Sequence, residues 1–251
     1  MKKELVKITI ITVCYNSEAT IEATIQSVAI QTYTNIEYII IDGASTDNTL
    51  TIISKYSHLV TKVISEKDKG LYYAMNKGIK LATGDVIGIL NSDDFYKNEF
   101  VIQKIANEFE IKNVDMVYGN IDYINKDEKI VRFWKSSIYK INSFKTAWHP
   151  PHPSLFVKKT VYEKYGHFDT DFKIASDFEL MLRFFERHSL SSSYLNDTTV
   201  TMLLGGVSNT FSGILKGRNE IMRAFKKNKI RPSFFYLAYR YLPKIYNILK
   251  K

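Results

Sequence analysis

Strand-like and helix-like segments alternate along the first ninety residues of this chain of 251 residues. Short apolar runs rich in β-branched side chains indicate buried strands, and apolar side chains three or four positions apart indicate helices. The expected strands cover residues 7–13, 37–41, 59–64 and 86–90. Such alternation predicts an α/β fold, in which a mostly parallel sheet is flanked by helices and joined by right-handed crossovers.

Three helices are expected between these strands. Asn16 and Ser17 are candidate N-caps of the first, Thr46 or Asp47 opens the second, and the third spans 71–81 before Gly84 stops it. The first helix has an apolar stripe of Ile21, Ile25 and Val28, and the second carries Leu50, Ile53 and Tyr56. In the third, Met75, Ile79 and Leu81 are expected to face the core.

The pattern is less regular after Asp94. A helix over 99–109, strands over 116–121, 130–134 and 154–157, an irregular loop over 149–153 and an amphipathic helix over 176–187 are expected there. Proline at three of five positions, Pro150, Pro151 and Pro153, is the reason to expect the loop.

The composition indicates the cellular compartment in which the protein is expected. One cysteine, Cys14, excludes a disulfide framework and favours a reducing, cytoplasmic location. The N-terminus is a weak match to a signal peptide, and no run of about 18 apolar residues predicts a transmembrane helix.

The net charge of +9 is concentrated in the C-terminal tail. Residues 216–251 hold eleven Lys and Arg side chains and one acid, Glu220, while the rest of the chain is near neutral. We therefore expect a main domain over 1–211 and a basic, aromatic-rich helical tail over 212–251. An apolar stripe formed by Ile214, Ile221, Met222 and Phe225 fits either packing on the protein or binding to an anionic membrane. No recognition motif supports nucleic-acid binding.

Asn91-Ser92-Asp93-Asp94 directly follows the strand over 86–90. Adjacent carboxylates repel each other unless a cation lies between them, and ligands bind at the carboxyl ends of strands in open α/β sheets. A solvated turn is the alternative, because Asn, Ser and Asp commonly form turns.

Two further strands also end in polar loops, at Tyr15-Asn16 and at Asp42. Parallel strands would bring the three loops to one edge, as in a nucleotide site with a metal. The sequence has no G-x-x-x-x-G-K-[ST] and no G-x-G-x-x-G segment, which disfavours P-loop and dinucleotide-binding proteins. The diphosphate would instead need a divalent cation, Mg²⁺ or Mn²⁺.

At this point the sequence resembles the inverting glycosyltransferases of family 2, which have the GT-A fold. The resemblance covers about residues 5–210. It is carried by ITVCYNSEATIEATIQSV, YIIIDGASTDNT, EKDKGLYYAMNKGIKLATGDVIGILNSDD, HPPHPSLF, GHFD and IASDFEL, in that order.

The resemblance implies a role for each matching residue. Asp93 and Asp94 would hold the metal, and Asp177 would be the catalytic base. The residues implied in binding the nucleotide-sugar donor, most plausibly a UDP-sugar, are Thr12, Tyr15, Asn16, Asp42, Lys69, Asn76, Asn91, Ser92 and His152. The acceptor would be a glycan or lipid-linked hydroxyl, and it would enter over the loop at 149–153 and the segment at 204–208. Such acceptors occur in polysaccharide biosynthesis, which fits an enzyme peripheral to the inner face of the membrane.

Three positions depart from the family pattern. Asn91 stands at the first acidic position of the metal motif and weakens expected metal affinity, Ala44 replaces a frequent Gly, and Pro153 replaces a Gln. Asn91 is also the one feature that favours a non-catalytic nucleotide-sugar-binding module. A sugar nucleotidyltransferase would need a Gly-rich basic loop where the chain has Cys14-Tyr15-Asn16-Ser17-Glu18.

Overall fold

The computed structural model describes residues 5–204 and 211–240, with the side chains of 211–214 excepted. The first half contains β1 (Ile8–Cys14), α1 (Ile21–Ala29), β2 (Ile36–Asp42), α2 (Thr49–Lys55), β3 (Lys62–Ser65), α3 (Leu71–Leu81), β4 (Val86–Ile89), β5 (Asp94–Tyr96) and α4 (Val101–Lys112). The second contains β6 (Met116–Ile124), β7 (Ile130–Trp134), the 3₁₀ helices η1 (Ser143–Thr146) and η2 (His152–Ser154), β8 (Phe156–Lys158), α5 (Lys159–Tyr165), α6 (Ser176–Leu182), a π-helical turn (Arg183–Arg187), β9 (Ser192–Leu203) and α7 (Phe211–Lys227).

One mixed sheet organises the molecule. Its strand order is β3-β2-β1-β4-β8-β6-β9-β5, and β7 pairs with β6. Strands β1 to β4 are mutually parallel, whereas β8 runs antiparallel to both β4 and β6. The expectation of a mostly parallel sheet is therefore confirmed, with reversed strands in its second half.

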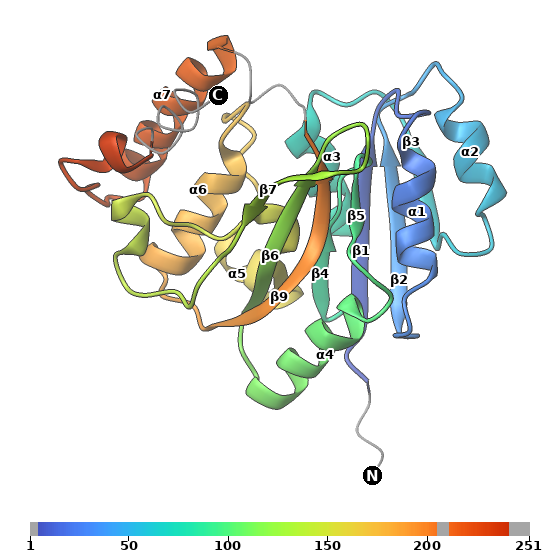
Figure 1. Cartoon of the computed structure of the whole chain (residues 1–251), viewed down its shortest axis with the longest axis horizontal. Helices are drawn as coiled ribbons and strands as arrows, with labels where there is room; N and C mark the ends of the chain where they lie inside the picture. The colour runs from blue at the N-terminus through green and yellow to red at the C-terminus, as the bar shows by residue number, and fades with distance from the viewer. Residues whose placement is uncertain (1–4, 205–210, 241–251) are drawn as a thin grey trace.

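Helices cover both faces of the sheet (Figure 1). Side chains from alternate positions of β1 belong to two cores, one shared with α1, α2 and α4 and the other with α3, α5, α6 and α7. Ile10 thus packs into one core and Ile11 into the other, as the twofold repeat of a strand requires. Since both faces are covered, β1 is buried along its whole length.

Several local expectations were wrong. Helix α1 begins at Ile21 after Thr20, so neither Asn16 nor Ser17 caps it, and α2 begins at Thr49 rather than near Thr46. The 149–153 segment ends in the turn η2 instead of being irregular throughout. Helix α6 is buried on nearly all sides and is not amphipathic, because α7 covers the side that would otherwise face water. β5, α5 and the long strand β9 were not predicted.

Helix α7 packs against α6 rather than standing apart. Ile221, Ala224 and Phe225 are buried in the core that α6 shares with α3, while Met222 is exposed. A helical segment over 236–240 adds Tyr236, whose ring packs edge-on against Phe225 at 5.0 Å. The described part of the tail is therefore continuous with the core of the catalytic region. Across 5–204 and 211–240, no helix is long and apolar enough to cross a membrane.

Candidate active site at the carboxyl edge of the sheet

The strand directions bring the predicted residues to one edge of the sheet. β1, β2 and β4 are parallel, so the loops that begin at Tyr15, Gly43 and Leu90 leave from the same edge. β8 runs the other way, and Phe156 near its start pairs with Gly88 near the end of β4. The turn η2 precedes β8 and packs against both β4 and α6, which carries Asp177. His152 therefore belongs to a turn that packs against both the strand before the Asp93 loop and the helix that carries Asp177.

The four residues after β4 have different environments. Asp93 reaches solvent, but the protein packed around its carboxylate raises its pKa. Asp94 is fully buried as the first residue of β5, and burial together with the nearby Asp93 charge raises its pKa well above the usual range. Ser92 shares a hydrogen bond of 2.8 Å with the hydroxyl of Ser17. Asp93 is thus the acid most available to a ligand.

Two oxygens in this loop suit a cation. Oδ1 of Asn91 and Oδ1 of Asp94 are both buried and have no hydrogen-bond partner in the protein. Unpaired buried oxygens are costly, and carboxylate and amide oxygens are ligands for Mg²⁺ and Mn²⁺. In the part of the chain that the structure describes, no three His, Cys, Asp or Glu side chains form a metal site by themselves. The residues therefore fit a cation that takes further ligands from a bound diphosphate.

Tyr15 forms an open aromatic surface at the end of β1. Its side chain is 62% exposed, and its ring lies over Gly43, where a Cβ atom would meet the Tyr15 ring atom Cδ2 at 3.4 Å. Flat aromatic rings of this kind stack on nucleobases. Because Gly43 has no side chain, the Tyr15 ring can pack against the loop with its other face open to solvent.

Asp42 is fully buried and acts on its neighbours rather than at the surface. Its Oδ2 accepts hydrogen bonds from the Ser45 backbone N–H at 3.0 Å and from the Ser65 hydroxyl at 2.6 Å, and its Oδ1 accepts from the Ser45 hydroxyl. The thiol of Cys14 also donates to Oδ1, at 3.6 Å. The serine hydroxyls, which the sequence reasoning missed, are the groups that reach solvent here, and Asp42 orients them.

Two of the predicted donor-binding side chains are occupied within the protein. The Thr12 side chain is fully buried, and its hydroxyl is 3.0 Å from that of Tyr38, so it offers no surface to a ligand. Asn16 has a φ of +48° and accepts the Thr46 backbone N–H at 2.9 Å. It therefore shapes the loop beside Tyr15.

Asp177 lies in the first turn of α6 and is partly exposed. Its charge affects the pKa values of two nearby groups. Burial, and after it the Asp177 charge, raises the pKa of Tyr72. Burial lowers the pKa of His152, and the Asp177 charge opposes this effect. Phe168 lies between those two rings, stacked on Tyr72 at 5.5 Å and edge-on to His152 at 5.4 Å. The expected base, Asp177, and the expected donor-binding residue His152 are therefore neighbours.

Asn76 and Lys69 lie on the α3 side of the site. The Asn76 amide donates to the Phe168 carbonyl at 2.8 Å and accepts the Phe168 N–H at 3.0 Å, so it holds the loop between α5 and α6. Lys69 is exposed and, with Tyr72 and Lys173, lines a hollow of about 40 Å³ at the start of α3. Lys69 remains free to meet a negatively charged ligand, whereas Asn76 has a positioning role.

The C-terminal segment reaches the site, which the sequence did not reveal. An Arg240 guanidinium nitrogen lies 3.3 Å from Nε2 of His149, and the guanidinium lies 5.7 Å from the centre of the Phe178 ring. His149 also packs edge-on against Trp134 and Phe178. The loop over which we expected the acceptor to enter is therefore partly covered by residue 240.

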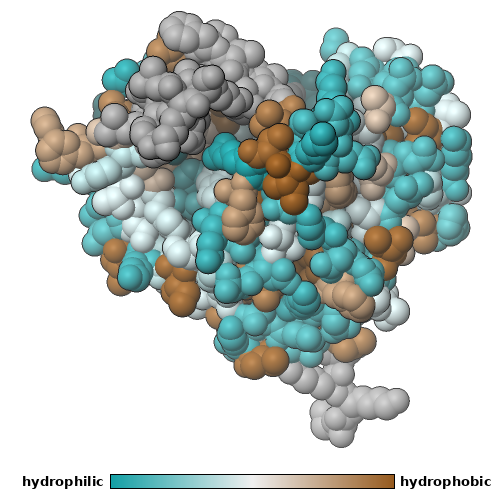
Figure 2. Space-filling view, in the orientation of Figure 1, coloured by the Kyte–Doolittle hydropathy of each residue, from teal (hydrophilic) through white to brown (hydrophobic). Residues whose placement is uncertain are grey.

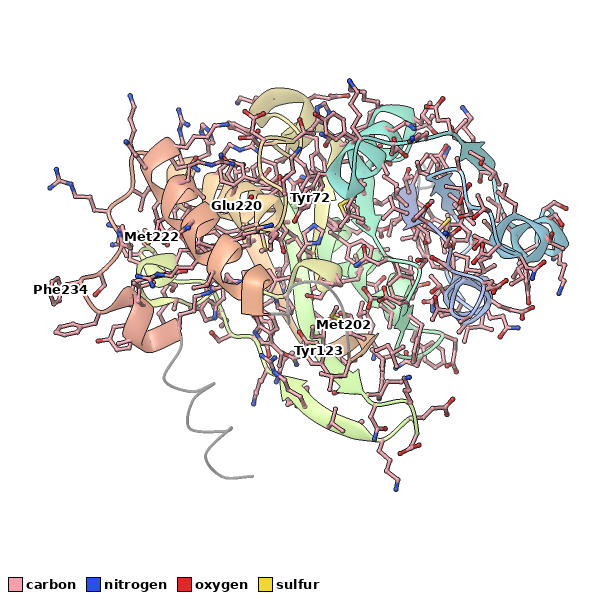
Figure 3. The ribbon with its side chains drawn as sticks, turned by 90° about the horizontal axis from the view of Figure 1, so that it is seen from above. Tyr72, Tyr123, Met202, Glu220, Met222 and Phe234 are labelled. Carbon is pink, nitrogen blue, oxygen red and sulfur yellow. The ribbon has the colours of Figure 1, made fainter. Side chains whose placement is uncertain are left out.

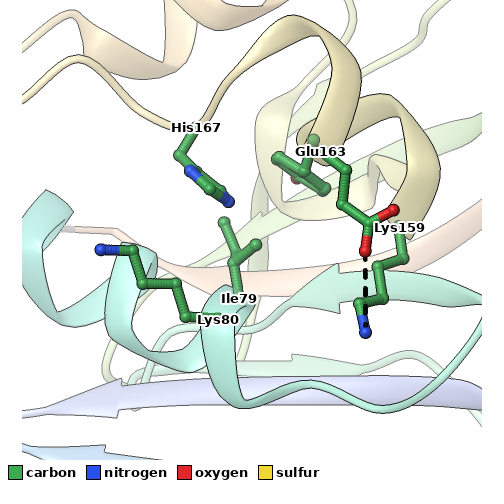
Figure 4. Close-up of a pocket in the computed structure, with 6 residues that line it drawn as sticks. Ile79, Lys80, Lys159, Glu163 and His167 are labelled. Atoms are coloured by element: carbon green, nitrogen blue, oxygen red, sulfur yellow. Dashed lines mark ion pairs between the residues drawn. The ribbon is translucent and has the colours of Figure 1, made fainter.

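A larger hollow of about 250 Å³ lies elsewhere, between α3 and α5 (Figure 4). Lys80, His167 and the ion pair of Lys159 with Glu163 line it. Lys159 follows β8, whose last residue pairs with Val86 at the start of β4. This hollow thus lies at the opposite edge of the sheet and takes no part in the site.

A mostly parallel sheet flanked by helices, with an acidic loop after β4, is the arrangement of the GT-A fold, as expected. Residues 9–175 match the family model described as Glycosyl transferase family 2, and the chain belongs to this family. The protein is therefore a glycosyl-transferring enzyme.

Curated relatives and solved structures agree with this assignment. A PGL/p-HBAD biosynthesis glycosyltransferase of Mycobacterium bovis is 27% identical over 78% of this chain and 76% of its own length. An Escherichia coli UDP-Glc:alpha-D-GlcNAc-diphosphoundecaprenol beta-1,3-glucosyltransferase, WfaP, is 37% identical over 51% of each chain.

Two solved structures share the fold. Residues 1–349 of Staphylococcus aureus TarS in complex with UDP-GlcNAc match with a TM-score of 0.71 and 19% identity, over 93% of this chain and 69% of that one. A mannosyltransferase from Pyrobaculum calidifontis in complex with GDP-Man and Mn²⁺ matches with a TM-score of 0.67 and 18% identity, over 96% and 70%. The present chain covers 41% of a longer TarS structure.

Proposed function

We propose that this enzyme transfers a sugar, with inversion, from a UDP-sugar to a hydroxyl of a glycan or lipid-linked acceptor. The observation that carries the proposal is that Asp93 follows β4 and Asp177 lies in the first turn of α6, while the turn that holds His152 packs against both β4 and α6. The Asp93 carboxylate can hold a cation at the departing diphosphate, and the Asp177 carboxylate can accept the proton of the incoming hydroxyl. Inversion requires these two functions on opposite sides of the sugar.

Asp93 would be the principal ligand of Mn²⁺ or Mg²⁺. Asn91 supports it through an unpaired buried oxygen, and Asp94 lies behind both, with its own unpaired Oδ1. When bound, the cation supplies positive charge that stabilises the departing diphosphate. Lys69, exposed beside α3, and the neutral imidazole of His152, whose pKa burial lowers, complete the surroundings proposed for the phosphates.

Asp177 would accept the proton of the acceptor hydroxyl. Its position in the first turn of α6 favours the ionised carboxylate, because the partial positive charge of a helix N-terminus lies there. Its Oδ1 accepts the Phe178 N–H at 2.7 Å, which leaves Oδ2 for the acceptor. A carboxylate held at one oxygen keeps a fixed direction, as general-base catalysis needs.

The Tyr15 ring would stack on the uracil base, and the Ser45 and Ser65 hydroxyls would meet the edge of the base or the ribose. The choice of uridine is supported by the relative whose name specifies UDP-Glc and by the structural neighbour bound to UDP-GlcNAc. Asp42 would act through the two serines that it orients.

A lipid-linked acceptor is supported by the diphosphoundecaprenol substrate named for the E. coli relative. The segment 205–208, also expected at the acceptor entrance, lies outside the described residues. Trp134 and Trp148 are partly exposed beside the His149 loop and would give the entrance an aromatic wall, with the fully buried Phe144 packed behind Trp148. Aromatic rings suit the apolar faces of sugars.

A turn after α7 would contact an anionic membrane. Phe234 and Phe235 are 94% and 58% exposed, and Figure 3 shows Phe234 at the far left of the molecule, where apolar surface also protrudes in Figure 2. Lys229 and Arg231 are exposed beside them, and residues 221–240 contain no acid. Exposed aromatic and basic side chains together favour the interface of an anionic bilayer, which would place the enzyme peripherally on the membrane.

Binding of a panel of nucleotide sugars, measured by calorimetry with and without Mn²⁺, tests the proposal. We expect one UDP-sugar to bind best, with Mn²⁺ increasing its affinity, and to be hydrolysed or transferred when an acceptor is supplied. Binding without any turnover would instead support the non-catalytic module that Asn91 first suggested. Preference for another nucleotide would exclude the UDP-sugar.

A further inference from the structure

Glu220 of α7 binds the backbone of the segment that leads into α6. Its Oε1 accepts the N–H of Lys173 at 2.9 Å, and its Oε2 accepts those of Ile174 at 2.8 Å and Ala175 at 2.9 Å. Asp177 follows two residues later. Three bonds from neutral N–H groups to one carboxylate are charge-assisted and stronger than ordinary backbone bonds.

The same segment is held from the opposite side by α3. The Tyr72 hydroxyl donates to the Ile174 carbonyl at 2.9 Å, so Ile174 is bound through both its N–H and its C=O. Figure 3 labels Tyr72 and Glu220 close together in the region between α3 and α7. The Ser176 hydroxyl donates to the Asp169 carbonyl at 2.8 Å and closes the loop. The backbone before Asp177 is therefore fixed in direction.

Helix α6 has no cap of its own. Its N-cap residue is Ala175, and no side chain of the N-cap residue makes a capping hydrogen bond. Helices normally depend on such a side chain to hold their first turn. Here Glu220 binds the Ala175 N–H from a separate helix, 45 residues along the chain.

Other contacts of α7 reach the same loop. The Arg223 guanidinium donates to the Asp171 carbonyl at 2.8 Å and lies 4.0 Å from the centre of the Phe172 ring, and Lys227 pairs with the Asp169 carboxylate. These groups hold α7 against the loop, but the residues that they contact precede Asp177 by five residues or more. Phe225 of α7 packs edge-on against Phe178, next to Asp177, but among the described residues of α7 it is Glu220 that hydrogen-bonds the backbone leading into α6.

We propose that Glu220 is a positioning residue that sets the direction of the Asp177 carboxylate, so that α7 belongs to the catalytic unit. This rests on the proposed function of Asp177 as the base. An error of about 1 Å in the placement of a reacting group costs on the order of 10²-fold in rate. Loss of the three bonds is therefore a loss of turnover more than of donor affinity.

Steady-state kinetics and thermal unfolding of four full-length variants test this: Glu220→Ala, Glu220→Gln, Asp177→Asn and the Asp177→Asn/Glu220→Ala double variant. We expect Glu220→Ala to lower kcat by about 10- to 100-fold with little change in the KM for the donor. Glu220→Gln should recover part of kcat, because its one remaining carbonyl oxygen can still accept two of the N–H bonds. In the Asp177→Asn background the Ala substitution should have little further effect. Arg218→Ala, at an exposed position of α7, is the matched control.

The outcomes separate the two proposals. If Asp177→Asn abolishes turnover but Glu220→Ala keeps kcat, Glu220 does not position the base, although Asp177 remains the base. If Asp177→Asn keeps its turnover, both assignments are wrong. Equal losses in kcat from Glu220→Ala and Glu220→Gln that follow only the fraction of folded protein would show that Glu220 merely docks α7. Should Glu220→Ala not fold, the kcat of folded Glu220→Gln decides the question.

Discussion

The side-chain amide of Asn91 donates a hydrogen bond to Oδ2 of Asp94 at 2.9 Å, and this bond leaves Oδ1 of each residue buried without a partner. Asn91 therefore does two things at once. Its N–H₂ group satisfies part of a carboxylate that is fully buried, and its oxygen remains available beside the exposed Asp93. The amide, which we expect to bind a metal more weakly than a carboxylate would, thus also allows the loop to fold when no cation is bound.

Asn91→Asp should raise the affinity for metal and lower the stability of the metal-free protein. We expect Mn²⁺ to bind the donor-free protein about tenfold more tightly, because ligand charge sets the affinity of such sites. Without metal the variant should unfold at a lower temperature, since Asp94 loses its hydrogen-bond donor and gains a like charge. Calorimetry and thermal unfolding measure both. Asn107→Asp on the exposed side of α4 is the control, and equal Mn²⁺ affinity in the two variants would exclude residue 91 from the metal site.

Asp177→Asn should lower turnover by about 10² or more, because the amide cannot accept the proton of the acceptor hydroxyl. Donor binding should change little, since Asp177 is assigned to the acceptor. Rates and donor affinity are measured on the same preparation, with Asp171→Asn in the preceding loop as the control. Transfer at nearly the wild-type rate by Asp177→Asn would exclude this carboxylate as the base.

Tyr15→Ala should weaken UDP binding by about 5- to 100-fold, because stacking of a base on an aromatic ring contributes about 1–3 kcal/mol. Tyr15→Phe keeps the ring and should bind UDP nearly as well as the wild type. Calorimetry with UDP alone measures the effect without involving the sugar. The stacking assignment fails if the Ala and Phe variants bind UDP equally.

Phe234→Ser combined with Phe235→Ser should reduce binding to vesicles that contain anionic lipid, and raised salt should reduce wild-type binding, because screening weakens the basic contribution. Deleting the whole tail is a poor test, because Ile221 and Phe225 are buried in the core. Sedimentation with anionic and neutral vesicles measures binding. Ile111→Ser, 79% exposed on α4, is the control, and unchanged binding by the double variant would exclude the aromatic turn.

Glu37 should make the protein sensitive to acid. Burial works to raise its pKa, but hydrogen bonds from Thr83 and Thr9 outweigh burial and lower it. A carboxylate with a lowered folded-state pKa contributes stability that is fully present above the unfolded value of about 4.3 and is lost as the pH falls through the folded value. Glu37→Gln should lower the free energy of unfolding by about 1–3 kcal/mol at pH 7. The free energy of unfolding of this variant should also fall less steeply below about pH 4.3 than that of the wild type. Denaturant unfolding across pH checks this, and equal acid sensitivity of both proteins would exclude Glu37.

The periodic part of the fold was predictable because local pattern determines it. Helix α3 lies at Leu71–Leu81, as the spacing of Met75 and Ile79 predicts, and β1 and β2 lie within a residue or so of their apolar runs. The long strand β9 escaped prediction, because its burial varies along its length: it pairs with β6 on one side and, near its end, with β5 on the other. Its stability comes from partners distant in sequence.

The sequence predicted which loops meet at the carboxyl edge of the sheet, but not which of their side chains are free to bind a ligand. Asp42 and Asp93 both follow apolar strands, so sequence alone ranks them alike. In the folded protein Asp42 is fully buried under Ser45 and Ser65, whereas Asp93 reaches solvent. The two serines carried no signal, since serine in a loop is ordinary.

The amino-acid sequence by itself determined the βα alternation, the glycosyltransferase family and the chain positions of Asp93 and Asp177, because these depend on side-chain order along the chain. Only the tertiary structure decided which side chains are free to act, since burial and hydrogen bonding depend on residues far apart in sequence. Glu220 makes the difference plain. In the sequence it is one acid within a basic tail, and in the folded protein its carboxylate accepts three backbone N–H groups beside Asp177.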